Sequence, residues 1–181
     1  AVSRFYAARV RGVGYWTGAN IALAVGLLLL GLSQTANDLP ARVIGNTLLV
    51  VTTALYYLAI QRLLCDKPSA RLAWTTVAAA GLVFTLQWSS AAPYQLAVGA
   101  LSIALMILTG LSAARLLLPL SADKPVSYRF TGLLFFIGCT LMTVRLGYTL
   151  LSDNPPAHLF APNFWQGIIL GGAHIITMLM S

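Results

Sequence analysis

The sequence predicts an all-α membrane protein: a bundle of six transmembrane helices with little of the chain outside the bilayer. Of its 181 residues, 59% are hydrophobic and only 8% are charged, and the mean hydropathy is +0.83. A soluble domain carries about 25% charged residues. The chain has no Glu, and its four acidic residues are Asp38, Asp66, Asp123 and Asp153. So few charges cannot cover a water-soluble globule, but they can cap a bundle surrounded by lipid.

The chain divides into a short N-terminal segment, 1–14, and a transmembrane domain, 15–181. The segment mixes Arg4, Arg9 and Arg11 with apolar residues, which is typical of a cytoplasmic or interfacial helix. Six apolar runs follow, and each is close to the roughly 20 residues that a helix needs to cross the bilayer. Because the runs are continuous rather than alternating, they are not barrel strands. The expected helices are 15–33, 43–64, 71–89, 94–118, 129–151 and 162–181.

Prolines and short polar residues mark the ends of these helices, since proline stops a helix and favours a turn. The breaks contain Pro40, Pro68, Pro93, Pro125 and the pair Pro155-Pro156. Two of them share a pattern, because Asp-Lys-Pro occurs at 66–68 and again at 123–125. The repeat would fit three helical hairpins in tandem. The alternative is that any short cytoplasmic turn needs a helix stop and a positive charge.

The basic residues predict the orientation, because cytoplasmic loops carry an excess of Lys and Arg. Nine of the eleven lie on one side: Arg4, Arg9, Arg11, Arg62, Lys67, Arg71, Arg115, Lys124 and Arg129. Only Arg42 lies on the other side, and Arg145 falls inside the fifth run. With six spans, both termini would be cytoplasmic. The same distribution argues against nucleic-acid binding, since the basic residues flank apolar runs and form no basic arm.

Arg145 is the first candidate for a functional residue, because an ionisable group at membrane depth is costly and is often functional. It lies six residues before the end of its helix, at a depth of about 9 Å. One interpretation is a side chain that snorkels to the outer head groups. The other is a charge facing the bundle interior, where it binds an anionic ligand together with Tyr148, which lies at one-turn spacing.

Further polar and aromatic residues cluster toward the predicted outer side. Most would form the aromatic belt of a membrane protein, but some could line an outward-facing pocket with Arg145. The candidates for such a pocket are Asn46, Trp88, Trp165 and Gln166. His174, in the middle of the last run, is a packing residue or a ligand contact; with no second histidine in any span, haem ligation is not expected. On the cytoplasmic half, Asn20, Tyr56, Tyr57 and Gln61 are candidates for interhelical hydrogen bonds.

Small residues at four-residue spacing indicate close helix packing. They occur at Gly18, Ala22 and Gly26 in the first run and at Gly167 and Gly171 in the last. The partner is either another helix of the same bundle or a second copy of the chain, so a homodimer through the first or sixth helix is expected.

Several kinds of site are excluded by the sequence. It has no phosphate-binding glycine loop, no metal-spaced cluster and no nucleophile elbow, so no cofactor, metal or catalytic residue is expected. No acidic residue falls within an apolar run, which argues against a proton-coupled transporter. Cys65 and Cys139 are predicted at different depths, so a disulfide between them is not expected.

A family resemblance extends over the whole chain. The arginine-rich entry, the run Tyr15-Trp16-Thr17-Gly18-Ala19-Asn20, the pair Gly45-Asn46 and the Asp-Lys-Pro turns resemble the N-terminal six-helix sensor regions of bacterial diguanylate cyclases. In that family the last membrane helix leads into a cytoplasmic GGDEF domain that makes cyclic di-GMP. No GGDEF signature occurs here, and the apolar end of the sequence suggests that an output domain would follow.

The resemblance implies a sensory or regulatory module of the bacterial inner membrane rather than an enzyme in itself. Its partners would be the lipid bilayer, a second copy of the chain, and an amphiphilic or anionic small molecule. Two other functions stay open: a small transporter or permease subunit, and a structural membrane anchor.

Overall fold

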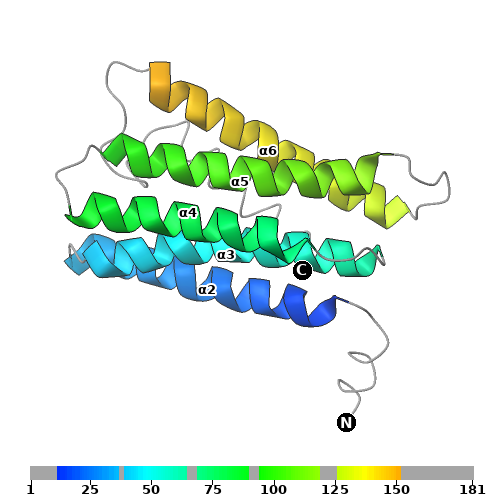
Figure 1. Cartoon of the computed structure of the whole chain (residues 1–181), viewed down its shortest axis with the longest axis horizontal. Helices are drawn as coiled ribbons and strands as arrows, with labels where there is room; N and C mark the ends of the chain where they lie inside the picture. The colour runs from blue at the N-terminus through cyan, green and yellow to red at the C-terminus, as the bar shows by residue number, and fades with distance from the viewer. Residues whose placement is uncertain (1–11, 37–38, 65–68, 90–93, 119–125, 152–181) are drawn as a thin grey trace, which may run out of the picture. The chain divides into compact units, whose positions relative to one another are not determined.

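The computed structural model describes residues 12–36, 39–64, 69–89, 94–118 and 126–151. Apart from single residues at their ends, these ranges are helical (Figure 1), so the all-α prediction is confirmed. The helices are α2 (Val13–Ala36), α3 (Leu39–Leu63), α4 (Ala70–Ser89), α5 (Tyr94–Leu117) and α6 (Val126–Leu151).

The expected bundle of six transmembrane helices is wrong. The described residues form five helices, and four contain a segment long and apolar enough to cross a membrane: Val13–Ser33, Pro40–Leu63, Gln95–Leu117 and Val126–Leu151. The third expected span, α4, is not among them because its 20 residues include Arg71, Gln87 and three threonines, which lower its hydropathy. The expected helix 162–181, on which the cytoplasmic C-terminus depended, lies outside the described residues. The chain is therefore a membrane protein with four candidate spans in its described part.

The chain forms two compact units, Ala1–Ala91 with α2, α3 and α4, and Ala92–Ser181 with α5 and α6. The arrangement of three hairpins in tandem, which the sequence left open, would group α4 with α5. The division into units groups α4 with α2 and α3, and α4 packs on α3, where a β-carbon at Gly81 would lie 3.7 Å from Cγ2 of Thr47. A β-carbon at this distance would make an ordinary van der Waals contact, so the packing of α4 on α3 does not require glycine at 81.

In the first unit α3 is the central helix, and α2 crosses it at two glycines. A β-carbon at Gly45 would lie 2.7 Å from Cγ of Leu30 and 3.0 Å from the carbonyl oxygen of Gly26. The backbones meet here because neither glycine carries a side chain. Nearer the start of α2, Gly12 adopts φ +101° beside the carbonyl oxygen of Ala59, a conformation and a contact that suit only glycine. The small-residue pattern of the first run is thus used, at Gly26, inside the chain.

In the second unit α5 and α6 form a closely packed antiparallel pair. A β-carbon at Gly132 would lie 2.8 Å from Cβ of Leu116, and one at Gly110 would lie 3.3 Å from Sγ of Cys139. The thiol of Cys139 also donates to the carbonyl oxygen of Met106, at 3.6 Å. Cys139 is a free cysteine.

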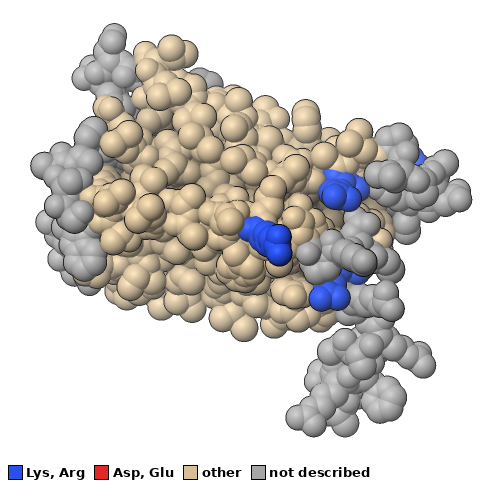
Figure 2. Space-filling view, in the orientation of Figure 1, with Lys and Arg blue, Asp and Glu red and all other residues tan. Residues whose placement is uncertain are grey.

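The surface of the described helices is apolar, as a lipid-facing surface must be. On α2 the exposed residues Ile21, Val25, Leu28 and Leu32 follow one helical face. Figure 2 shows tan side chains interrupted by a few blue ones, and none of the described residues is acidic. Many threonine hydroxyls are satisfied within their own helix; those of Thr52 and Thr149, for example, donate to the carbonyl four residues earlier, so they need no water.

Candidate functional site

Arg145 lies on the buried face of α6. Its side chain is 6% exposed, whereas the neighbouring Val144 is 50% exposed. The helix places it on the same side as the residues that face protein, namely Gly132, Leu134, Phe135, Met142 and Thr149. This burial favours the second interpretation of Arg145, a charge facing the interior, over a side chain that snorkels along the lipid surface.

The backbone around Arg145 is held by regular helical contacts. The hydroxyl of Thr149 donates to the carbonyl oxygen of Arg145 at 2.8 Å, which satisfies the buried hydroxyl one turn later. The next residue, Leu146, contacts α5, where a β-carbon at Gly99 would lie 3.9 Å from its Cδ1. Arg145 is therefore presented by a rigid helix at the point where α6 runs beside α5.

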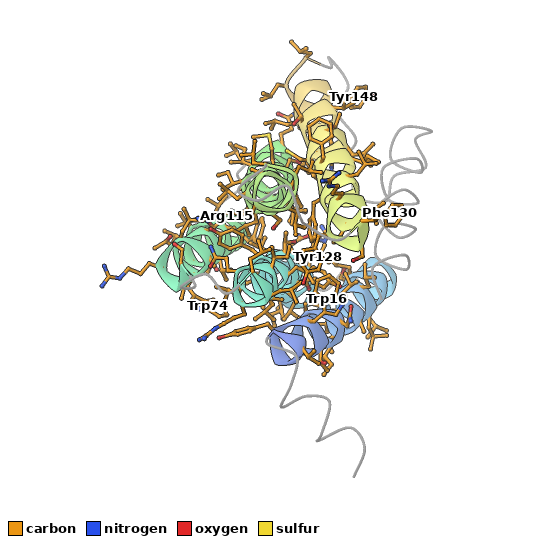
Figure 3. The ribbon with its side chains drawn as sticks, turned by 90° about the vertical axis from the view of Figure 1, so that its right-hand side faces the viewer. Trp16, Trp74, Arg115, Tyr128, Phe130 and Tyr148 are labelled. Atoms are coloured by element: carbon orange, nitrogen blue, oxygen red, sulfur yellow. The ribbon has the colours of Figure 1, made fainter. Side chains whose placement is uncertain are left out.

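Helix geometry brings one of the other candidate residues close to Arg145. Tyr148 follows three residues later on α6, where Figure 3 shows it, and it is half-buried. Trp165, Gln166 and His174 lie outside the described residues. Trp88 belongs to α4, but its side chain also lies outside the described part.

Asn46 belongs to α3, in the first unit, whereas Arg145 belongs to the second. Asn46 is 6% exposed, and its Oδ1 atom has no hydrogen-bond partner among the described residues. Ser102 on α5 is fully buried, and its hydroxyl likewise has no partner within the part of the chain that the structure describes. Buried polar atoms without a partner are unusual in proteins and call for an explanation.

The charged side chains among the described residues are all positive. All four acidic residues of the chain fall outside the part that the structure describes, whereas Arg42, Arg62, Arg71, Arg115, Arg129 and Arg145 fall within it. The described helices also bring together no group of three His, Cys, Asp or Glu side chains able to hold a metal ion. What this arrangement can do chemically is attract and hold an anion, most strongly where an arginine is withdrawn from water.

Comparisons with known proteins assign no family. No protein-family model, curated protein or solved structure matches this chain. Any inference about the function of this chain therefore has to come from its own sequence and structure.

The expected hydrogen bonds between helices are confirmed for one pair. The hydroxyl of Tyr56 on α3 donates to Oδ1 of Asn20 on α2 at 2.6 Å. The ring of Trp16 lies 4.7 Å from the ring of Tyr56, centre to centre, and the two ring planes are inclined at 58°. Trp16 and Asn20 belong to the run 15–20, and in this structure that run joins α2 to α3.

Gln61, another of these candidates, bonds to the residue that precedes α4. Its Oε1 accepts the backbone N–H of Ser69 at 2.6 Å, just before α4 begins. The first N–H groups of a helix have no partner within the helix, so this side chain acts as a cap supplied by α3.

One cluster was missed by the sequence analysis. The hydroxyl of Thr143 lies 3.3 Å from Sδ of Met106 and donates to the carbonyl oxygen of Cys139 at 2.9 Å. These residues join α5 and α6. No sequence signal pointed to them, because methionine and threonine are ordinary residues of membrane helices.

Proposed function

We propose that the chain is a membrane-embedded sensory or regulatory input domain that binds an anionic amphiphile through Arg145 and controls a cytoplasmic output domain. The observation that carries the proposal is the burial of an arginine in an otherwise uncharged stretch of α6. Following the family resemblance, the output domain is a diguanylate cyclase.

The energetic reason is the cost of placing arginine in a membrane helix, which is about 2.5–3.5 kcal/mol at the centre on insertion scales. A lipid-facing arginine lowers this cost by extending to the head groups, but the side chain of Arg145 is buried. Its guanidinium offers two parallel N–H donors that match a carboxylate or phosphate. These donors would bind an anionic head group whose aliphatic tail lies among the apolar helices.

The membrane is proposed to be the bacterial inner membrane, with the N-terminus in the cytoplasm. Within the first unit, Arg62 near the end of α3 and Arg71 at the start of α4 are exposed. Within the second, Arg115 and Arg129 are exposed at the α5–α6 connection. These ends would face the cytoplasm under the positive-inside rule.

A homodimer is part of the proposal, because such cyclases act through two output domains that meet face to face. The glycine strip of α2 contacts α3 within the chain at Gly26. The small residues Gly167 and Gly171 of the last apolar run, which lies outside the described residues, are therefore the better candidates for the interface.

The experiment that tests the proposed function measures cyclic di-GMP in cells that express the complete gene product. Arg145→Lys keeps the charge but loses the two-pronged donor geometry, so we expect a partial loss of the response to membrane lipid extracts. Arg145→Ala should abolish the response at unchanged protein level.

Val144→Ala is the matched control, since the exposed neighbour at the same depth should leave the response unaltered. An Arg145→Ala protein that responds to the extracts as the wild type does would overturn the proposal.

A further inference from the structure

The connection between α3 and α4 brings two exposed arginines to one end of the first unit. Oε1 of Gln61 accepts the backbone N–H of Ser69 at 2.6 Å, so the last turn of α3 is held beside the first turn of α4. Arg62 directly follows Gln61, and Arg71 lies two residues after Ser69. Both arginines are exposed, so two positive charges lie at the surface of the unit and at a similar depth.

An exposed apolar face of α4 continues from Arg71 along the helix. Trp74, Ala78 and Leu82 follow Arg71 at the spacing of one helical face, and all three are exposed. Ala73, on the opposite side of the helix, is fully buried. Because α4 packs on the candidate span α3, this exposed face is open to the bilayer from the side. Tryptophan at a helix end is typical of the membrane–water interface, so Trp74 places Arg71, one turn further out, at the level of the lipid head groups.

The charges of the two arginines are not neutralised by the described residues. Neither Arg62 nor Arg71 makes a hydrogen bond or an ion pair through its side chain within that part of the chain, which contains no carboxylate side chain. Asp66 and Lys67, in the connection itself, lie outside the described residues. Basic side chains at the membrane surface attract anionic lipids, and a basic site beside membrane helices is the kind of surface that binds phospholipid head groups.

We propose that this end of the first unit selectively binds a phospholipid with two phosphate groups, of the cardiolipin type. Arg62 and Arg71 each bind one phosphate, the ring of Trp74 lies at the level of the glycerol groups, and an acyl chain extends along the exposed face at Ala78. The occupant is a lipid rather than a soluble anion, because the pair of charges continues into an exposed apolar face. The site does not depend on Arg145 or on the proposed output domain.

Quenching by brominated lipids tests which lipid lies next to this face. In the full chain with Cys65 and Cys139 replaced by serine, bimane is attached at Ala78→Cys, and the protein is placed in phosphatidylcholine bilayers. A small fraction of the lipid carries brominated acyl chains and is phosphatidylcholine, phosphatidylglycerol or cardiolipin, at equal numbers of chains. We expect a preference over phosphatidylcholine of about fivefold for phosphatidylglycerol and on the order of twentyfold for cardiolipin. Quenching by cardiolipin that is no stronger than by phosphatidylcholine, or no stronger than by phosphatidylglycerol, would overturn the proposal.

Variants assign the two phosphate contacts. Arg62→Gln and Arg71→Gln should each lower the preference for cardiolipin about fivefold, to the level of phosphatidylglycerol, because one phosphate loses its partner. Arg129→Gln removes the same charge from α6, in the second unit, and should leave the preference at position 78 unchanged. If Arg129→Gln lowers the preference as much as Arg71→Gln does, cardiolipin responds to the net charge of the protein rather than to this site, and the proposal is wrong.

Discussion

At the scale of single residues, polar side chains inside the apolar helices decide which helices meet. Asn20 and Tyr56 are 36 residues apart, yet they form a 2.6 Å hydrogen bond between α2 and α3. The sequence identified both as candidate partners because polar side chains in lipid seek one another. It could not say which candidates pair, since that depends on the rotation of each helix about its axis.

The first prediction concerns this hydrogen bond. Tyr56→Phe should lower the free energy of unfolding in detergent micelles or bicelles by about 0.5–1 kcal/mol, because the amide of Asn20 loses its partner. Tyr57→Phe is the matched control, since Tyr57 is as buried but makes no hydrogen bond through its hydroxyl to the described residues. Equal destabilisation by the two changes would show that the bond contributes nothing specific.

Arg145 shows the limit of sequence analysis at this scale. Its expected depth of about 9 Å rests on its six-residue distance to Leu151, the last residue of α6, and stays a prediction. Its direction did not follow from the sequence, because snorkelling and burial are compatible with the same position in the chain. Trp165, Gln166 and His174 stay predictions, since they lie outside the described residues.

At the scale of elements, helix limits were predictable because proline and short polar residues terminate apolar runs. The largest difference is at the start of α3, which begins at Leu39 rather than at residue 43, because Pro40 fits within the first turn of a helix. A proline at this position lacks only an N–H that would have no partner within the helix. Pro40 thus marks a helix limit, as expected, but it lies inside the first turn of α3 rather than in the loop before it.

The second prediction concerns the crossing of α2 and α3. Gly45→Ala places a β-carbon 2.7 Å from Cγ of Leu30 and 3.0 Å from the Gly26 carbonyl oxygen, so the helices must separate. We expect a loss of about 1–3 kcal/mol in the free energy of unfolding.

Gly31→Ala provides the control for this change. A β-carbon at Gly31 meets nothing within 4 Å, and alanine favours helix over glycine, so this variant should be neutral or more stable. If Gly45→Ala is as well tolerated as Gly31→Ala, the glycines do not set the approach of α2 to α3.

At the scale of the whole molecule, the sequence predicted a membrane protein correctly and its architecture incorrectly. Composition alone showed that the chain cannot cover a water-soluble surface. The predicted number of spans was wrong because α4 is a helix but is not apolar enough to count as a candidate span. Arg71, Gln87 and three threonines lower its hydropathy. The grouping of helices was not predictable, since each run is apolar nearly all round and its periodicity indicates no face for a neighbour.

The third prediction concerns orientation. In a protein with Cys65 and Cys139 replaced by serine, cysteines at exposed helix ends are labelled with a membrane-impermeant maleimide. Ser69→Cys and Val126→Cys, at the arginine-rich ends, should react only after the membrane has been permeabilised. Pro40→Cys and Leu151→Cys should react in intact cells. Labelling of Ser69→Cys in intact cells would reverse the proposed orientation.

The central claim is that α6 turns Arg145 toward protein rather than toward lipid, and quenching by brominated lipids tests it most directly. In the same cysteine-free background, bimane is attached at two pairs of neighbours of nearly equal depth: the buried positions 145 and 149, and the exposed positions 144 and 150. Lipids brominated on their acyl chains should quench bimane strongly at 144 and 150 and weakly at 145 and 149. Quenching at 145 as strong as at 144 would place the arginine in lipid and contradict the account.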